Sequence, residues 1–352
     1  TASASGCRST ETGFTAPRPR RGAVNRGSPE RASADPGRDA RLRPVPSEGH
    51  ESATRLENKG FGMALLPQFL ANGVVIGSSY VLVALGLTLI FGILKIVNFA
   101  HGEFYVLGGY LAVLGSQWLG FPPLPALVLV IVCMAAFGWG VERFIFLPIG
   151  KHDPTNVIIA SFGLSILLQN VFLKVAGPEP MIAKSGLPAG AIRLGSVFLT
   201  SERIAIVAAA AVTVTVLLVV LRFTWVGLSL RALSENATVA RISGINVRRV
   251  AVVTFMIGSS LAGLSGALMS SVFMVQPGGG VLVVMKAFIV VVMAGMGSIE
   301  GAIVAGLGLG VVEALVTGYL GSEMRDIIGF LIVIAVLAVR PQGLFGLKTE
   351  RS

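Results

Sequence analysis

The stretch GLTLIFGILKIVNFAHGEFYVLGGY, Gly86–Tyr110, governs how the rest of the chain is interpreted. It begins as the end of an apolar segment, then places Lys95, Asn98, His101 and Glu103 among apolar residues and glycines, and apolar sequence resumes at once. An ionisable group at membrane depth costs roughly 2.5–3.5 kcal/mol on insertion scales, so such groups are usually paired, cavity-facing or interfacial. Two interpretations follow: an interfacial loop at headgroup level, or a short segment that lines the path of a polar solute.

The composition is that of a membrane protein. Of 352 residues, 53% are hydrophobic and 13% are charged, whereas ordinary soluble domains carry about 25% charged residues. The net charge of +10 does not indicate nucleic-acid binding, because part of it lies in the first 62 residues and the rest lies mainly in loops between apolar segments. The two cysteines form no C-x-x-C or His/Cys cluster, so we expect neither a disulfide framework nor a metal site.

Residues 1–62 differ from the rest of the chain. They are rich in Arg, Pro, Ser, Gly and Ala, and such a segment cannot bury enough apolar surface to offset the entropy lost on ordering. We therefore expect a disordered basic tail followed by a transmembrane domain over residues 63–348. Because Met63 directly precedes the first apolar segment, we also expect the natural start to lie at or near Met63.

From residue 66 onward the chain reads as an all-α polytopic membrane protein. A membrane span needs about 20 mostly apolar residues, with a range of roughly 17–25. Eight or nine candidates meet or approach this length: 66–92, 100–119, 124–142, 156–175, 203–221, 250–274, 281–297, 299–320 and 325–340. Two points leave the span count open. The segment 100–119 either crosses the membrane or forms a re-entrant segment, and the spans 281–297 and 299–320 are separated only by the turn Gly297–Gly301.

Basic residues set the expected orientation. The loop 222–249 carries five arginines against one glutamate, and this loop, the loop 143–156 and the C-terminal segment 340–352 should be cytoplasmic. The Pro-containing loop 176–202 then faces the periplasm. Eight spans place the N-terminus inside and nine place it outside, and both remain open.

Small residues recur at four-residue spacing in the apolar segments, which allows helix backbones to pack closely. The pairs are Gly73/Gly77, Ser259/Gly263, Ala262/Gly266, Gly297/Gly301 and Gly306/Gly310. No G-x-x-x-x-G-K-[ST] sequence is present, so any ATP that drives this protein must be bound by another polypeptide.

Four motifs in order carry a resemblance to a known family. After Gly86–Tyr110 come RALSENATVARISGIN (Arg231–Asn246), KAFIVVVMAGMGSIEG (Lys286–Gly301) and RPQGLFG (Arg340–Gly346). Over about residues 64–348 the chain resembles the LivH-like permease subunits of bacterial ABC importers for branched-chain amino acids.

The resemblance implies the ABC importer permease fold in the bacterial inner membrane, surrounded by lipid. It also implies a second homologous permease subunit, two ATP-binding cassette subunits that hydrolyse ATP, and a periplasmic substrate-binding protein. No cofactor is expected on this chain itself. Permeases for urea and short-chain amides share most of these motifs, so they remain an alternative for the substrate.

The resemblance also assigns a role to the basic loop 222–249. Arg231–Asn246 has helical character with Gly244 as a suitable terminator, and it is similar to the coupling helix that docks on the ATPase subunit. The matching positions, and thus the candidate coupling residues, are Arg231, Glu235, Asn236, Ala237 and Gly244. Without the resemblance, an ordinary basic loop that follows the positive-inside rule is favoured.

Asn98, His101 and Glu103 are the candidates for solute contact or gating, and Glu300 lies in a comparable Gly-rich break. A zwitterionic amino acid needs a carboxylate, a cation or helix ends to replace its lost water. His101 and Glu103 alternatively pair with each other or cap a helix.

Four further polar residues in or beside the apolar segments have structural interpretations. Gln169 and Asn170 are expected to form interhelical hydrogen bonds. Lys286 and Asp326 are expected near span ends, where long side chains reach the interface.

No catalytic motif is present. The three histidines are scattered, and neither G-x-S-x-G nor H-E-x-x-H occurs. The sequence therefore predicts a transporter subunit rather than an enzyme. The alternatives from other classes are a self-sufficient channel or secondary transporter that uses His101 and Glu103, and a structural membrane scaffold.

Overall fold

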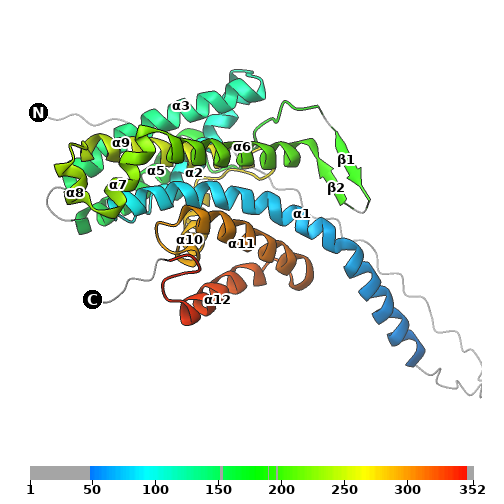
Figure 1. Ribbon diagram of the computed structural model, residues 1–352. Helices are drawn as coiled ribbons and strands as arrows, with labels where there is room; N and C mark the ends of the chain where they lie inside the picture. Colours follow the sequence, from blue (N-terminus) through cyan, green and yellow to red (C-terminus); the bar gives the residue numbers. More distant parts are fainter. Residues whose placement is uncertain (1–47, 151–153, 189, 196, 347–352) are drawn as a thin grey trace, which may run out of the picture. The chain divides into compact units, whose positions relative to one another are not determined.

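The computed structural model describes residues 48–150, 154–188, 190–195 and 197–346 (Figure 1). The chain divides into two units, 1–51 and 52–352, and nearly all described residues belong to the second. Most of the expected tail lies outside the described residues. Residues 48–62 of that tail are already helical, as the beginning of helix α1.

The described part of the chain is predominantly helical, as the sequence predicts. The α-helices are α1 (Glu48–Leu94), α2 (His101–Val113), α3 (Pro123–Val141), α4 (Leu147–Ile149), α5 (Pro154–Ala176), α6 (Ser201–Phe223), α7 (Trp225–Glu235), α8 (Ala237–Ile242), α9 (Val247–Met269), α10 (Gly279–Ala294), α11 (Ile299–Leu320) and α12 (Met324–Val339). Two π-helical segments, η1 (Leu114–Trp118) and η2 (Glu142–Phe146), follow α2 and α3 directly.

Six helices in the described residues are long and apolar enough to cross a membrane. They are Leu65–Leu94, Pro123–Ile149, Thr155–Ala176, Ser201–Phe223, Val247–Met269 and Ile299–Leu320. The other three expected spans correspond to shorter helices: α2 has 13 residues, and α10 and α12 have 16 each. The expected count of eight or nine spans is therefore not confirmed by helix length.

Helix α1 runs between α9 and α11 (Figure 1) and contacts both. Gly77 on α1 packs against the backbone of α11 near Gly310. A Cβ at Gly77 would lie 2.9 Å from the Cα of Leu307, one turn before Gly310. On its other side, α1 places the Ser79 hydroxyl 2.8 Å from the Ser265 hydroxyl of α9. Small residues thus allow α1 to approach two neighbours at backbone distance, as their four-residue spacing predicts.

Helix α9 is the second centre of packing. A Cβ at Gly108 of α2 would overlap the backbone of Gly263, and a Cβ at Gly266 would overlap the carbonyl of Tyr105. On another face, Gly138 of α3 lies against Ser259. The contact between α2 and α9 fixes the position of α2, which begins with the polar residues of the stretch Gly86–Tyr110.

One end of the bundle is closed by the loops that follow α5 and α9. Met181 and Val275 exchange backbone hydrogen bonds of 2.9 and 2.7 Å. The same loop region continues into a hairpin of β1 (Ala191–Leu194) and β2 (Val197–Thr200), which pair antiparallel. The segment expected to face the periplasm is therefore tied to the α9–α10 loop.

The R-P-Q-G-L-F-G motif packs against the end of α10. Leu344 and Phe345 donate backbone hydrogen bonds of 2.8 and 2.9 Å to the carbonyls of Met293 and Ala294. Gly295 has a φ of +96°, and a Cβ there would lie 2.9 Å from the Gln342 carbonyl. Only glycine combines that left-handed backbone with such a close approach.

Candidate pathway and coupling sites

Asn98 and His101 hold the start of α2 against α1. Helix α1 ends at Leu94, and Lys95 adopts a left-handed φ of +56°. Asn98 Oδ1 accepts a 3.0 Å hydrogen bond from the Ala100 N–H, and His101 Nε2 donates to the Val83 carbonyl at 3.1 Å. Both side chains are fully buried. The Asn98 side chain thus closes the turn that precedes α2, whose N-cap residue is Ala100.

Glu103 lies in the first turn of α2, two residues after His101, and is also buried. Its Oε1 accepts hydrogen bonds from Gln169 Nε2 at 2.9 Å and from Ser165 Oγ at 3.3 Å, both on α5. The carboxylate faces Gly280, where a Cβ would lie 2.5 Å from Oε1. His101 and Glu103 therefore contact different helices rather than each other.

Gln169 connects Glu103 to an open pocket. It forms the interhelical hydrogen bond that the sequence predicts, whereas Asn170 Nδ2 donates to Ile166 of its own helix. Gln169 also lines a polar pocket of about 490 Å³ with Gln276 and neighbouring residues. Glu103 thus lies one side chain away from a space that a polar solute can enter.

Glu300 lies apart from this group. It is exposed in the first turn of α11, whose N-terminus is capped by Ser298 Oγ accepting from the Gly301 N–H at 3.1 Å. The partners of Glu103 come from α5 and α10 instead. The structure therefore does not bring Glu300 and Glu103 into one cluster.

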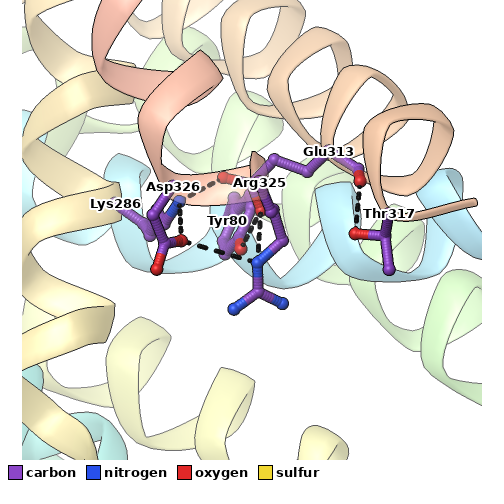
Figure 2. A network of polar contacts seen from close by, with 6 residues as sticks. All are labelled: Tyr80, Lys286, Glu313, Thr317, Arg325 and Asp326. Carbon is purple, nitrogen blue, oxygen red and sulfur yellow. Dashed lines mark hydrogen bonds and ion pairs between the residues drawn. The ribbon is translucent and has the colours of Figure 1, made fainter. Parts of the chain in front are cut away.

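A charged network joins α1, α10, α11 and α12 (Figure 2). Lys286 Nζ pairs with Glu313 Oε1 and lies 2.8 Å from Asp326 Oδ1. The Tyr80 hydroxyl donates to Glu313 Oε2 at 2.7 Å, and Arg325 Nε lies 3.9 Å from Glu313 Oε2 and 3.5 Å from Asp326 Oδ1. The negative charges of two carboxylates thus compensate the positive charges of Lys286 and Arg325.

Tyr80, Lys286 and Glu313 lie within the length of their helices, whereas Arg325 and Asp326 lie in the first turn of α12. Asp326 is thus at a helix end, as the sequence predicts. Tyr80 is half-way along the span Leu65–Leu94, and the Lys286 side chain is only 7% exposed. The expectation that Lys286 reaches the interface was therefore wrong: an apolar helix that buries an ammonium at mid-length must supply a counter-ion. A lysine and a glutamate inside two neighbouring apolar segments were the sequence signal for this pair.

The coupling segment forms two helices rather than one. Asn236 ends α7 and caps α8, and its Oδ1 accepts from the Thr238 and Val239 N–H groups at 2.9 and 3.1 Å. Gly244, with a φ of +85°, ends the segment as the sequence predicts. Arg231, Glu235 and Ala237 are exposed.

The outer face of α8 carries apolar side chains. Val239 is 58% and Ile242 is 82% exposed. By contrast, Leu230, Leu233 and Ala240 are buried and hold α7 and α8 to the bundle.

Within the described residues, no group of three or more His, Cys, Asp and Glu side chains is placed to hold a metal ion. The buried ionisable groups instead contact one another, helix backbone or, in the case of Glu103, the side chains of Ser165 and Gln169. The arrangement is suited to binding and conformational coupling.

The helices that carry these groups lie in a region that matches a known protein family. Residues 69–337 match the model of the family described as "Branched-chain amino acid transport system / permease component". The chain belongs to this permease family.

Individual members of this family align with most of the chain. The chain is 33% identical to the high-affinity branched-chain amino acid transport system permease protein LivH of Salmonella typhimurium over 292 residues, 79% of this chain and 95% of the relative. It is also 33% identical to LivH of Escherichia coli K12 over 298 residues, with the same shares covered. BraD of Pseudomonas aeruginosa, described in the same words, is 32% identical over 79% of this chain and 95% of its own length. No solved structure matches the chain.

Proposed function

We propose that the chain is one of two homologous permease subunits of an ATP-driven importer for branched-chain amino acids in the inner membrane. Its relatives LivH and BraD are named as permease proteins of such transport systems. The chain lacks a P-loop sequence, so separate ATPase subunits bind the nucleotide. A periplasmic binding protein delivers the substrate, and this chain contributes half of the pathway.

The observation that carries this proposal is the exposed face of α8. Val239 and Ile242 project from a six-residue helix between the spans α6 and α9. An apolar face in a basic loop that faces the cytoplasm has little reason to remain in water and marks a docking surface. The occupant is the ATPase subunit, and Arg231, Glu235, Asn236, Ala237 and Gly244 shape or flank this surface.

Helix α7 connects this surface to the membrane. It is packed by Leu230 and Leu233, and its N-cap Thr224 directly follows α6. A displacement of α8 by closing ATPase subunits therefore acts on α6 and α9 through a packed helix rather than a loose loop. ATP binding biases a two-state membrane element in this way.

We further propose that α10 and α12 cross the membrane as short spans, which gives eight crossings, or nine if α2 with η1 also crosses. With four spans α9–α12, the coupling loop and the C-terminal segment lie on the same, cytoplasmic side. Two contacts support this: Met181 with Val275 at one end, and Phe345 with Ala294 at the other.

Glu103 is the proposed pathway residue of the α2 region, because Gln169 links it to the polar pocket. Asn98 and His101 act by fixing the start of α2. Glu300, exposed at the α10–α11 turn, is proposed to act at the mouth of the pathway.

The test is co-purification with the ATPase subunits. We expect Ile242→Asp and Glu235→Arg each to leave the chain in the membrane but to reduce recovery of the ATPase at least about tenfold, since each alters the docking surface. The matched control is Phe198→Asp, which places the same charge on the exposed hairpin strand β2. Unchanged ATPase recovery in both Ile242→Asp and Glu235→Arg would remove the coupling role. Solute transport by this chain without ATP would favour a channel or secondary transporter.

A further inference from the structure

A second pocket opens beside the charged network. It has a volume of about 170 Å³, the space of about six water molecules. Its walls are of two kinds: Ile76, Leu282 and Val283 are among the apolar residues, whereas Lys286, Arg325 and Asp326 supply charge. A solute that fits this pocket therefore has an apolar part and charged groups close together.

The charges of the network divide into an inner pair and an outer pair. Lys286 and Glu313 have side chains only 7% and 1% exposed, whereas Arg325 and Asp326 are 38% and 45% exposed. The inner pair holds the outer pair in place, since Lys286 contacts Asp326 and Glu313 lies near Arg325. Lys286 also lines the pocket, but Arg325 and Asp326 are the more exposed charges and so the ones that a solute meets first.

Arg325 uses only part of its guanidinium inside the protein. Nε faces Glu313 and Asp326, and Figure 2 shows the two terminal nitrogens directed away from the network. Among the described residues, both ion-pair contacts of Arg325 are made by Nε, and neither uses a terminal nitrogen. The terminal nitrogens form the fork that suits a carboxylate.

The four charged groups sum to zero, because two cations face two anions. A bound anion or cation would leave the partly buried cluster with one uncompensated charge, which is costly. A zwitterion adds no net charge. Its carboxylate and ammonium groups also match the adjacent cation and anion of Arg325 and Asp326.

We propose that this pocket binds the transported amino acid as a zwitterion. Arg325 receives the α-carboxylate, Asp326 receives the α-ammonium group, and the wall of Ile76, Leu282 and Val283 contacts an aliphatic side chain. The proposal rests on the importer function proposed above and names the site at which this subunit holds its substrate. Near the middle of α1, the pocket has the depth at which transporters commonly bind substrate.

The pocket also separates the two substrate classes that the sequence left open. Urea and short amides have neither a carboxylate nor an ammonium group, so Arg325 and Asp326 would lose water without charge compensation. An aliphatic amino acid satisfies both groups. The pocket therefore selects against neutral amides.

The test is equilibrium binding of radiolabelled L-leucine to the purified complex of both permeases and the ATPase subunits, without the binding protein. Competitors are leucinol, which lacks the carboxylate, and 4-methylpentanoate, which lacks the ammonium group. We expect leucine to displace the label at least about tenfold better than either analogue. Arg325→Gln should weaken leucine binding by about tenfold or more and abolish the preference over leucinol, while the preference over 4-methylpentanoate remains. Arg325→Lys should restore part of the leucine affinity.

Arg340→Gln is the matched control, because it removes the same charge from the exposed far end of α12. It should bind leucine like the wild type. If the wild-type complex carries out ATP-driven leucine uptake but shows no saturable leucine binding, or if Arg325→Gln keeps the wild-type preference over leucinol, the pocket assignment is overturned. A wild-type complex without ATP-driven leucine uptake would instead overturn the importer proposal, so the two failures are distinguishable.

Discussion

Lys286→Met is the perturbation whose effect follows most directly from the structure. Methionine keeps most of the length of the side chain but removes the ammonium group that pairs with Glu313 and Asp326. Glu313 is 1% exposed and would keep the Tyr80 hydroxyl at 2.7 Å. The nearest remaining cationic nitrogen would be Arg325 Nε at 3.9 Å.

Breaking a buried ion pair by removing one partner costs about 3–5 kcal/mol. Because Tyr80 and Arg325 still face Glu313, we expect the lower end, about 3 kcal/mol. One kcal/mol shifts the unfolding midpoint by roughly 2–4 °C in domains of 150–250 residues. The expected loss for Lys286→Met is therefore about 6 °C or more.

The assay is the temperature at which half of the detergent-solubilised chain loses its monodisperse chromatographic peak. The double variant Lys286→Met/Glu313→Gln removes both charges and leaves an amide oxygen for Tyr80, so we expect it to recover most of the loss. Lys174→Met, at an exposed site, should match the wild type. A single variant as stable as the wild type, or a double variant less stable than the single one, would refute the interpretation of Lys286 and Glu313 as a compensated buried pair.

Three further outcomes are expected. Gly266→Ala should destabilise the chain by about 1–3 kcal/mol in the same thermal assay, because the new Cβ would overlap the Tyr105 carbonyl. Gly308→Ala is the control and should be neutral, because the space around Gly308 is open. Equal unfolding midpoints for the two variants would contradict the close packing of α2 on α9. Glu103→Gln should assemble normally but transport leucine more slowly in vesicles, and wild-type uptake kinetics would return Glu103 to a structural role. Asn236→Ala should cost α8 about 1 kcal/mol of capping energy and weaken ATPase binding several-fold in a titration, and unchanged affinity would show that the cap does not order the docking surface.

Much of the helix packing could be predicted from the sequence. The four-residue spacing of small residues identified Gly77, Gly310, Gly263 and Gly266 as close-approach positions, because such spacing places them on one helix face. Gly244 could be assigned as a terminator because glycine adopts positive φ without steric cost. These features depend on local geometry, which the sequence specifies.

The charged network could not be assembled in the same way. Lys286 and Glu313 lie 27 residues apart, on two helices whose relative rotation depends on packing against α1 and α12. A lone lysine in an apolar segment has two low-energy solutions, extending to the interface or pairing inside, and the sequence alone does not choose between them. The position of Glu103 against Gln169 likewise depends on how α2 packs, since α5 is distant in sequence.

The most direct test of the central claim is a mild-detergent purification of the chain from its own host's membranes, with companions identified by mass spectrometry. An importer permease should bring with it a second homologous permease and P-loop ATPase subunits, and the reconstituted assembly should take up leucine only with ATP. Recovery of this chain alone, stable and able to move solute in vesicles without ATP, would contradict the account.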